Sequence, residues 1–426
     1  MKGELLITHA AQLVTPAGPA RPRVGAEMRE LGIIKDGALL ARDGVIVAVG
    51  ATSEVAPQAA VDALHIDASN SVVMPGFVDA HTHPVFAGTR EDEYEMRAAG
   101  MTYQQIAASG GGIRSTVRRT RAASEEELFE LGKIRVRWLL EHGTTTVEAK
   151  SGYGLTVDDE LKILRVIRRL NDETALELIP TFLGAHEIPD EYRTRREDYI
   201  RLVLDEMLPR VAAEGLARYC DVFCESHVFT VNESRRVLTR AKELGLGIRL
   251  HAEQLSLSGG ASLAAELGAA SADHLEWVDQ AGIEALRQAG VIGILLPGAV
   301  FNLGLTHYAP ARAMIDAELP IALATDFNPG SSPTPSMQMI LSIACAQMRM
   351  TPAEVISAAT INGACSLGCE ARVGSLEAGK QADIVIYDCF DYRQIPYFFG
   401  VNHAVVVIKS GNVVVDTRGD VSSGLR

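Results

Sequence analysis

The sequence predicts an α/β fold, a (β/α)8 TIM-like barrel joined to a small composite β-sandwich domain formed from both termini. Three observations carry this prediction. Short apolar segments alternate with segments of helical periodicity through the middle of the chain. Polar residues suited to catalysis directly follow several of the apolar segments. Both ends of the chain carry short β-rich pieces separated by turn residues, without a long helical period.

The two ends of the chain are expected to pair with each other. Residues 44–50 form the clearest β-rich piece near the start, and residues 382–387 and 405–416 match it in the tail. Within the last of these, Ser410-Gly-Asn412 marks a hairpin turn. We expect residues 1–70 plus 372–426 to form the β-sandwich domain and residues 71–371 to form the barrel.

Apolar runs predict the strands of the barrel, and helical periodicity fills the gaps between them. The expected strands are residues 72–78, 144–149, 176–182, 220–224, 247–251, 271–274, 291–296 and 320–326. The clearest helices are residues 125–141, 158–170, 232–244 and 259–267. Eight strand–helix units are the number that closes a barrel of this class.

Composition excludes several classes of function. A formal net charge of -14 and a pI near 5.3 argue against binding to nucleic acid and to anionic membranes. The first residues lack the order of a secretory signal, and no apolar stretch is long enough for a membrane span. We therefore expect a cytoplasmic protein whose six cysteines are free thiols. An anionic substrate would need a local cationic pocket.

Candidate metal ligands stand at three predicted strand ends. His81 and His83 follow the first strand, and side chains two apart on a strand point to the same face. His251 ends the fifth strand and Asp326 ends the eighth. Each residue alone is more often structural. Together, three imidazoles and one carboxylate leave an open position for water, which predicts a mononuclear catalytic metal.

This constellation resembles the amidohydrolase superfamily, whose members join a His-x-His strand, a composite β-domain and a final Asp. Many dinuclear members carry a carboxylated Lys after strand four, but the chain reads Asp221-Val-Phe-Cys-Glu-Ser-His227 there. The resemblance therefore favours a single metal ion. It also implies that His274, at the end of strand six, lies beside the metal without ligating it. Lys150, which follows strand two, is expected to be structural.

Several longer stretches resemble one family within this superfamily, the imidazolonepropionases. They are residues 83–91, 109–117, 148–155, 181–187, 326–331 and 396–403. The resemblance implies hydrolysis of 4-imidazolone-5-propanoate to N-formimidoyl-glutamate in histidine degradation. It further implies one Zn²⁺ or Fe³⁺ per subunit, and a small-molecule substrate carrying a carboxylate.

The expected substrate residues agree with that chemistry. A guanidinium is the best bidentate partner for a carboxylate, so Arg90 is the expected propionate anchor. Arg114 is a second candidate cation. The remaining substrate-binding residues are expected to be Tyr153, His186, Gln254, Asn328, Gly330 and Ser331.

Asp326 and His274 are the expected catalytic residues. Asp326 would take a proton from water, His274 would stabilise the developing oxyanion, and either could protonate the leaving ring nitrogen. Gln254 stands where deaminase relatives carry a catalytic Glu, and a carboxamide cannot shuttle protons at neutral pH. Glu253 is a weaker candidate because on a strand it would point away from His251.

Two alternatives remain open at this stage: a mononuclear amidohydrolase that deaminates a heterocyclic base, and a catalytically inactive binding or scaffold protein on the same fold. Residues 110–112 are glycines without the Lys-Ser/Thr of a phosphate loop, so we expect a mobile lid segment there. The sequence does not choose between zinc and iron. It also leaves the oligomeric state open, with a homodimer as one alternative.

Overall fold

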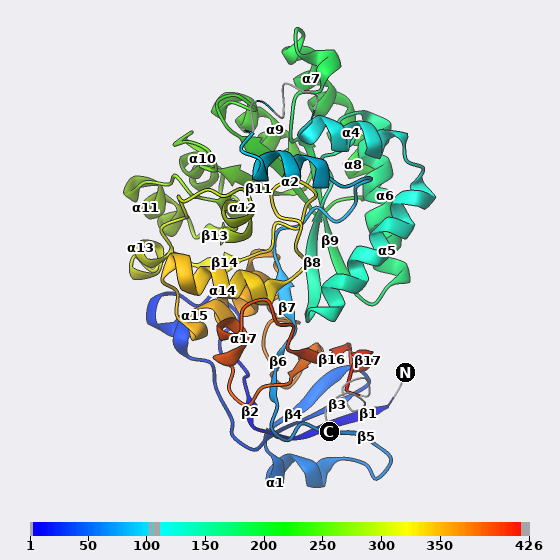
Figure 1. Ribbon diagram of the computed structural model, residues 1–426, viewed down its shortest axis with the longest axis vertical. Helices are drawn as coiled ribbons and strands as arrows, with labels where there is room; N and C mark the ends of the chain where they lie inside the picture. The colour runs from blue at the N-terminus through cyan, green and yellow to red at the C-terminus, as the bar shows by residue number, and fades with distance from the viewer. Residues whose placement is uncertain (1–2, 102–104, 106–110, 419–426) are drawn as a thin grey trace.

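The apolar segments of the central chain form parallel strands that pair in sequence order (Figure 1). This computed structural model describes residues 3–101, 105 and 111–418. In that part of the chain, the eight strands of the barrel are β7 (Phe77–Asp79), β8 (Thr144–Lys150), β9 (Glu177–Ala185), β10 (Tyr219–Cys224), β11 (Gly247–Ala252), β12 (Ser271–His274), β13 (Ile292–Leu295) and β14 (Ile321–Leu323). The fold class predicted from the sequence is confirmed.

The barrel closes through the segments that follow its first and last strands. The backbone N–H of Asp326 donates to the carbonyl of His81 at 3.0 Å. The N–H of His83 donates to the carbonyl of Phe327 at 2.8 Å. Closure therefore places the His-x-His pair directly beside Asp326, although 242 residues lie between His83 and Asp326 in the sequence.

The predicted first strand is two strands in the structure. Residues 72–75 form β6 (Val72–Pro75), which pairs with strands of the terminal sheets, and β7 begins the barrel after Gly76. A Cβ at Gly76 would overlap the side chain of Thr145, so only glycine permits this approach to β8. Both strands are buried, so residues 72–78 read as one continuous apolar run. The sequence therefore does not show that β6 and β7 belong to different sheets.

The last strand of the barrel is shorter than predicted. It ends at Leu323, and the side chain of Asp79 then accepts the N–H and the hydroxyl of Thr325 at 3.0 and 2.6 Å. Asp326 adopts a left-handed backbone with φ 52°. The side chain of Asp326 is thus set by a turn beyond the strand.

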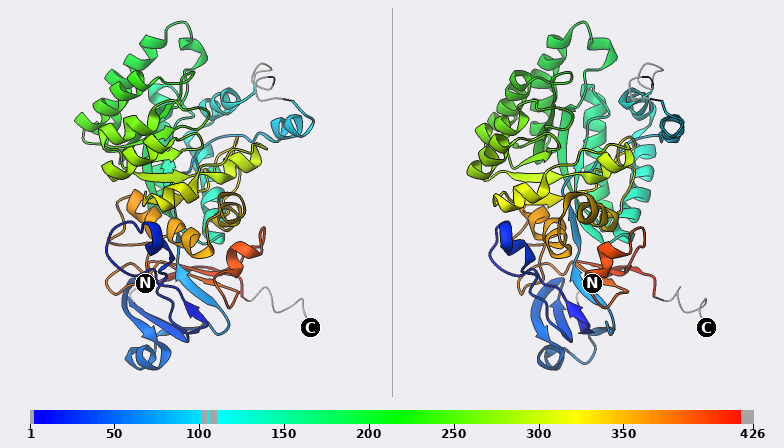
Figure 2. Two further views of the ribbon diagram at one scale, coloured as in Figure 1. Left: turned by 90° about the vertical axis from the view of Figure 1, so that its left-hand side faces the viewer. Right: turned by 60° about the vertical axis from the view of Figure 1, so that its left-hand side comes forward.

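Amphipathic helices cover the outside of the barrel (Figures 1 and 2). Ser124, Thr156 and Thr230 cap three of them by accepting a backbone N–H of the first turn. The helices around the barrel are α5 (Glu125–Glu141), α6 (Val157–Glu173), α7 (Arg196–Leu202), α8 (Leu208–Ala213), α9 (Val231–Glu243), α10 (Gly260–Leu267), α11 (Gln280–Ala289), α12 (Pro297–Asn302), α13 (Ala311–Asp316), α14 (Met337–Met348), α15 (Pro352–Ala359) and α16 (Ile361–Ser366). The helix predicted over residues 125–141 has those bounds in the structure.

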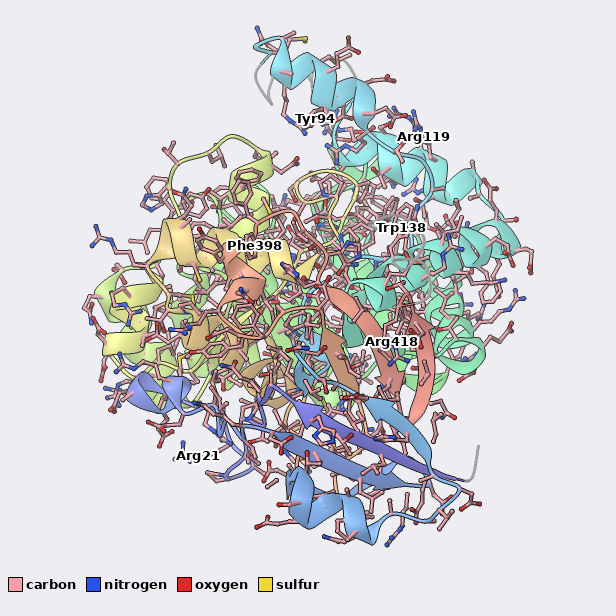
Figure 3. The ribbon with its side chains drawn as sticks, turned by 60° about the horizontal axis from the view of Figure 1, so that its bottom comes forward. Arg21, Tyr94, Arg119, Trp138, Phe398 and Arg418 are labelled. Atoms are coloured by element: carbon pink, nitrogen blue, oxygen red, sulfur yellow. The ribbon has the colours of Figure 1, made fainter. Side chains whose placement is uncertain are left out.

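Between β7 and α5, the chain forms a segment that projects from the barrel. It carries α2 (Glu91–Ala98) and α4 (Ile113–Ala122), and Tyr94 and Arg119 mark these helices in Figure 3. Figure 2 shows the segment on the side of the barrel away from the terminal sheets. Of the predicted lid, Gly110 lies outside the described residues, whereas Gly111 and Gly112 lie inside them.

Strands from both ends of the chain form two further sheets at the other end of the barrel. In the described residues, a four-stranded sheet has the order β4 (Val45–Ala51), β3 (Gly37–Arg42), β1 (Glu4–Ala10), β5 (Leu64–Asp67), and a five-stranded sheet has the order β17 (Asn412–Asp416), β16 (Ala404–Lys409), β15 (Ile384–Tyr387), β6, β2 (Gln12–Leu13). One apolar core joins them, with Ile7 and Leu39 from the first sheet and Ile384 and Val406 from the second. The division at residues 70 and 372 stays a prediction.

The predicted hairpin in the tail is confirmed. β16 and β17 pair antiparallel, and Ser410 and Gly411 both have positive φ between them. The six cysteines carry no disulfide, as expected. Among the helices that the structure describes, none has the length and apolarity that crossing a membrane requires.

Candidate metal centre and substrate cavity

The predicted metal ligands converge at the carboxyl ends of the barrel strands. Nε2 of His81 and Nε2 of His83 lie 3.6 and 3.7 Å from Oδ1 of Asp326. His251, on β11, lies against His81 with 4.6 Å between the ring centroids. All four side chains are buried. The structure thus brings together the four residues that the sequence proposed as ligands.

The geometry of these side chains fits a metal ion. A nitrogen–oxygen distance of 3.6 Å is too long for a hydrogen bond, whereas two tetrahedral ligands at about 2.1 Å from zinc lie about 3.4 Å apart. Nε2 of His81 is buried and has no hydrogen-bond partner among the described residues. Three imidazoles and one carboxylate are donors that both zinc and iron accept.

Burial also prepares the imidazoles as ligands. Burial, assisted by Lys150, lowers the pKa of His81 well below its usual value. Burial and the neighbouring His186 do the same to the pKa of His83. Both rings are therefore neutral at physiological pH, and a neutral imidazole has the lone pair that a metal needs.

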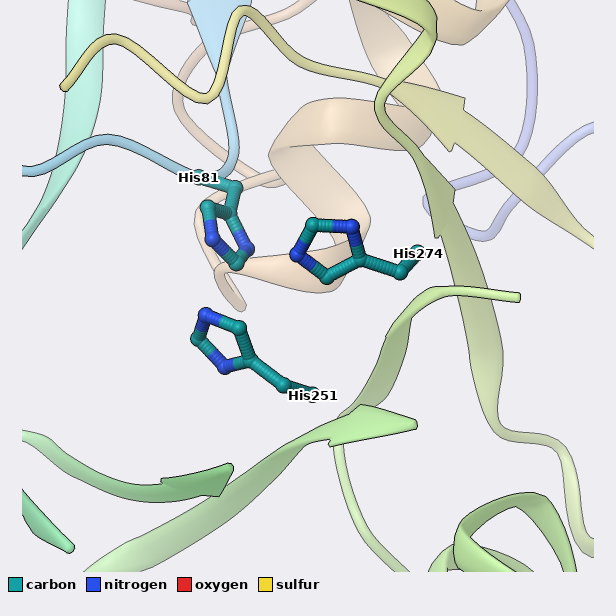
Figure 4. Close-up of side chains that lie close together, drawn as sticks. All are labelled: His81, His251 and His274. Atoms are coloured by element: carbon teal, nitrogen blue, oxygen red, sulfur yellow. The ribbon is translucent and has the colours of Figure 1, made fainter. Parts of the chain in front are cut away.

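His274 lies in the same cluster, as Figure 4 shows. Its ring centroid is 5.5 Å from that of His81 and 5.2 Å from that of His251. Burial opposes protonation, but Glu276, with an oxygen 3.5 Å from Nδ1, outweighs it and raises the pKa of His274. A ring nitrogen of His274 comes close enough to those of His81 and His251 to share an ion. Its role as a non-ligand stays a prediction.

A buried cluster of charged side chains, which the sequence reasoning missed, contacts the candidate metal ligands. Asp273 accepts from Nδ1 of His81 at 2.7 Å, and Oδ2 of Asp221 lies 3.0 Å from Nδ1 of His251. Such carboxylates fix the orientation of the ring and direct Nε2 to the metal. The available signal was an acidic residue inside each of two predicted strands, Asp221 in β10 and Asp273 in β12.

Lys150 lies between the carboxylates of this cluster. Its Nζ is 2.6 Å from Asp221, 2.8 Å from Glu148 and 3.5 Å from Asp273. Burial would lower the pKa of Lys150, but Asp221 and Glu148 outweigh it and raise that pKa, so the amine is an ammonium. Arg249 pairs with Glu148 at 2.9 Å. Lys150 therefore forms buried ion pairs with carboxylates that lie close to the candidate metal ligands.

A cavity of about 570 Å³ opens above the metal ligands. Its lining contains every residue that the sequence proposed for substrate, together with His83, His251, His274 and Asp326. Those proposed residues are Arg90, Tyr153, His186, Gln254, Asn328, Gly330 and Ser331. The rest of the lining adds Glu187 and Arg114, the latter paired with Asp190 at 3.3 Å.

Arg90 is held at the cavity wall by Glu93. The carboxylate of Glu93 accepts from Nε and Nη2 of Arg90 at 2.9 and 2.8 Å, and its other oxygen accepts the N–H of Gly112 at 2.8 Å. Nη1 of Arg90 lies where a Cβ at Gly330 would be. Glu93 therefore leaves Nη1 as the part of the guanidinium that faces Gly330.

Asn328 organises the turn that carries Asp326. Its Oδ1 accepts the N–H groups of Gly330 and Ser331 at 2.7 and 2.9 Å, and its Nδ2 donates to the carbonyl of Asp326 at 2.6 Å. The hydroxyl of Ser331 donates to Oδ2 of Asp326 at 3.1 Å. Asn328 and Ser331, which were expected to bind substrate, thus use these hydrogen-bonding groups within the turn. There they fix the position of Asp326.

His186 and Tyr153 form another wall of the cavity. The His186 ring stacks on that of His83 with centroids 5.3 Å apart, and its Nδ1 binds the carbonyl of Gly152 at 3.0 Å. Burial lowers the pKa of His186 to about 3, so this ring is neutral. With Nδ1 bound to a carbonyl, the neutral ring carries its lone pair on Nε2.

Glu160, which the sequence reasoning missed, holds the loop of Tyr153. It is fully buried at the start of α6 and accepts the N–H groups of Gly152, Gly154 and Leu155 at 3.0, 2.7 and 2.8 Å. Burial raises the pKa of Glu160, against the effect of these donors. An acidic residue in the first turn of a predicted helix is common, so no specific signal marks Glu160 in the sequence.

Glu253 has a structural role in the loop beside Gln254. It is buried with φ 55° and accepts backbone N–H groups of Ser258, Gly259 and Ala261. It therefore points away from His251, as expected, and is committed to the start of α10. Gln254 itself faces the cavity.

Known proteins resemble this chain over nearly its whole length. The amidohydrolase family matches residues 72–414. An imidazolonepropionase from Solibacter usitatus (strain Ellin6076) is 57% identical over 96% of this chain and 98% of its own length. One from Symbiobacterium thermophilum is 52% identical over 97% of each chain.

Solved structures share the fold at low sequence identity. A zinc-containing adenosine deaminase from Xanthomonas campestris has a TM-score of 0.72 and 21% identity, covering 97% of this chain and 93% of the other. A triazine hydrolase variant has a TM-score of 0.74 and 16% identity, covering 97% and 95%. These likenesses concern the fold, whereas the long and close sequence matches concern the family. The chain belongs to the amidohydrolase family and, within it, to the imidazolonepropionases.

Proposed function

We propose that this protein hydrolyses the cyclic amide of 4-imidazolone-5-propanoate to N-formimidoyl-L-glutamate, a step of histidine degradation. The observation that carries the proposal is a single cavity lined both by three of the candidate metal ligands, His83, His251 and Asp326, and by Arg90. The full-length relatives named imidazolonepropionase support the same substrate.

Four residues would hold a single zinc or ferric ion: His81, His83, His251 and Asp326. When bound, such an ion lowers the pKa of water toward neutrality and polarises a carbonyl oxygen. Asp273 and Asp221 keep the imidazoles of His81 and His251 aimed at it. Ser331 and the Asn328 turn hold the Asp326 carboxylate in the same way.

Asp326 and His274 would move the protons. Burial raises the pKa of Asp326, and His274 partly opposes that rise, so the carboxylate is a better base than an exposed one. His274, with its raised pKa, can donate a proton to the developing oxyanion. One of them then protonates the ring nitrogen as the bond between the carbonyl carbon and that nitrogen breaks.

The cavity walls orient the substrate. Nη1 of Arg90, next to Gly330, would bind the propionate, and the neutral His186 would offer Nε2 to a ring N–H. Tyr153 and Gln254 border the same space. Because Gln254 cannot act as an acid or base at neutral pH, it positions the ring, which disfavours base deamination.

The test is to supply imidazolone propionate and follow the loss of its ring absorbance. Metal content is measured on the same sample by elemental analysis, before and after chelation. Substrate loss that chelation abolishes and metal restores supports the proposal. Ammonia release would instead support the deaminase alternative, and a well-folded sample that binds no metal would support the inactive alternative.

We also propose a cytoplasmic location and a homodimer. The six free cysteines suit a reducing compartment. Exposed aromatic side chains at Phe390, Tyr397, Phe398 and Phe399 offer an apolar contact surface for a second copy; Figure 3 marks Phe398. Light scattering of the purified protein at micromolar concentration tests the dimer, because a monomer would contradict it.

A further inference from the structure

The ammonium of Lys150 lies inside a cage of carboxylates beneath the metal ligands. Nζ is 2.6 Å from Asp221, 2.8 Å from Glu148 and 3.5 Å from Asp273. All four side chains are completely buried. The positive charge of Nζ therefore lies between three carboxylates, where the attraction of all three acts on it.

The cage needs a cation because two of its carboxylates also bind the imidazoles of candidate metal ligands. Asp273 binds His81 and Asp221 binds His251, so the cage keeps two carboxylates close together. An oxygen of Glu148 and one of Asp273 lie within 4.8 Å of each other and of a nitrogen of His81, a spacing that one metal ion could bridge. Arg249 reaches Glu148 at 2.9 Å from the other side. Without Lys150, three buried carboxylates would face one guanidinium.

We propose that the ammonium of Lys150 takes the place of a second metal ion and thereby keeps the centre mononuclear. This inference rests on the proposed metal centre above it. Lys150 acts through Asp221 and Asp273, so it is a positioning residue. The cage consists of oxygen ligands, which suit manganese or magnesium, whereas the imidazoles above suit zinc.

The experiment loads the full-length protein with zinc and then titrates it with Mn²⁺. Free manganese is followed by electron paramagnetic resonance, and bound zinc and manganese by elemental analysis. Wild type is expected to hold one zinc and no manganese. Lys150→Ala removes the ammonium and opens the space it occupied, so it should hold one zinc and one manganese, with manganese affinity at least 100-fold above wild type.

Two matched variants separate charge, space and general damage. Lys150→Met removes the charge but fills the space, so it should bind no manganese. Lys409 is another buried lysine, paired with Asp383 at 2.6 Å and Glu177 at 3.2 Å near the terminal sheets. Lys409→Ala should therefore bind no manganese either, although it also breaks a buried ion pair.

If Lys150→Ala binds one zinc and no manganese, the inference is wrong but the proposed metal centre stands. If the wild-type protein binds no zinc, the proposed metal centre itself is wrong. Manganese binding by Lys150→Met as tight as by Lys150→Ala also contradicts the placement of the ion. If Lys150→Ala folds only when manganese is added, as judged by thermal melting, the ion replaces the ammonium. If it stays unfolded with manganese, the inference fails.

Discussion

His81 has both ring nitrogens committed by its surroundings. Nδ1 binds Asp273 at 2.7 Å, and Nε2 faces Asp326 at 3.6 Å without a hydrogen bond. A carboxylate accepts only from a protonated nitrogen, so the pairing with Asp273 fixes the proton on Nδ1 and the lone pair on Nε2. A single carboxylate beside the ring thus leaves His81 with a lone pair on Nε2 that it can offer to a metal.

His274 differs from His81 because its partner raises its pKa. His274→Ala should lower kcat by about 10²–10⁴-fold, the usual range for a general acid or base, while zinc content stays near one per chain. Steady-state kinetics and elemental analysis on the same preparation check both. His307→Ala, at an exposed His stacked on Trp277, is the control and should change neither. A parallel fall in zinc would show that His274 is a ligand.

Gly330 is needed because the Arg90 guanidinium occupies the place of its side chain. Gly330→Ala should displace the end of Arg90 and raise KM about tenfold, or about 1.4 kcal/mol of binding. The overlap is with the flexible end of a side chain, so the melting temperature should hardly change. Kinetics and thermal melting separate the two effects. An unchanged KM would mean that Arg90 does not anchor the substrate.

At the scale of elements, buried glutamates fix the loops that follow the strands. Glu160 binds the loop after β8, and Glu253 binds the loop after β11. Each carboxylate satisfies several backbone N–H groups that would otherwise be buried without partners. The loops can therefore be irregular and still hold Tyr153 and Gln254 in place.

Glu160→Gln should loosen the Tyr153 loop. An amide keeps one accepting oxygen, so at least one buried N–H loses its partner, at a cost of about 1–3 kcal/mol in the free energy of unfolding. KM should rise while zinc content holds. Asp279→Ala removes the cap of α11, where Asp279 accepts the N–H of Gly282 at 2.8 Å, and should cost stability without changing KM. Equal KM values in the two variants would contradict the positioning role.

The start of α9 gives a pH dependence of stability. Burial opposes ionisation of Glu233, but Arg196 and the Thr230 cap outweigh it and lower the pKa of Glu233 to about 2, from an ordinary value of 4.5. A depressed carboxyl pKa stabilises the fold above pH 4.5, and that contribution is lost as pH falls through about 2.

Glu233→Gln should therefore flatten the dependence of the melting temperature on pH between about pH 4.5 and 2. Thermal melting across this range, in buffers of constant ionic strength, is the measurement. Glu243→Gln, which removes an exposed ion pair with Arg240 on the same helix, should leave the slope close to that of wild type. A wild-type slope in Glu233→Gln would contradict the assignment.

For the whole molecule, the barrel could be predicted because its strands are buried on both faces and its helices are amphipathic. Both patterns are local in sequence. The change of sheet at Gly76 could not be predicted, because β6 and β7 are both apolar. Only the close approach of Gly76 to Thr145 marks the point where one strand ends and the other begins. The candidate ligands could be proposed because the carboxyl ends of the strands meet at one face of a barrel.

The supporting residues could not be assigned in the same way. Glu148 and Lys150 lie on β8, Asp221 on β10 and Asp273 on β12. Their pairing depends on register around the barrel. The hydrogen bonds of Asn328 depend on the turn that follows β14. Sequence spacing shows which chemistry is present, whereas orientation arises only when the barrel closes.

The central claim is that the assembled barrel adds water across a ring amide. The most direct measurement is turnover of imidazolone propionate by the metal-loaded protein in ¹⁸O-water, with mass spectrometry of the product and an ammonia assay. The account predicts an opened product carrying one ¹⁸O in its new carboxylate, no ammonia, and no product after chelation. Release of ammonia with the ring intact, or ring opening without the isotope, would contradict it.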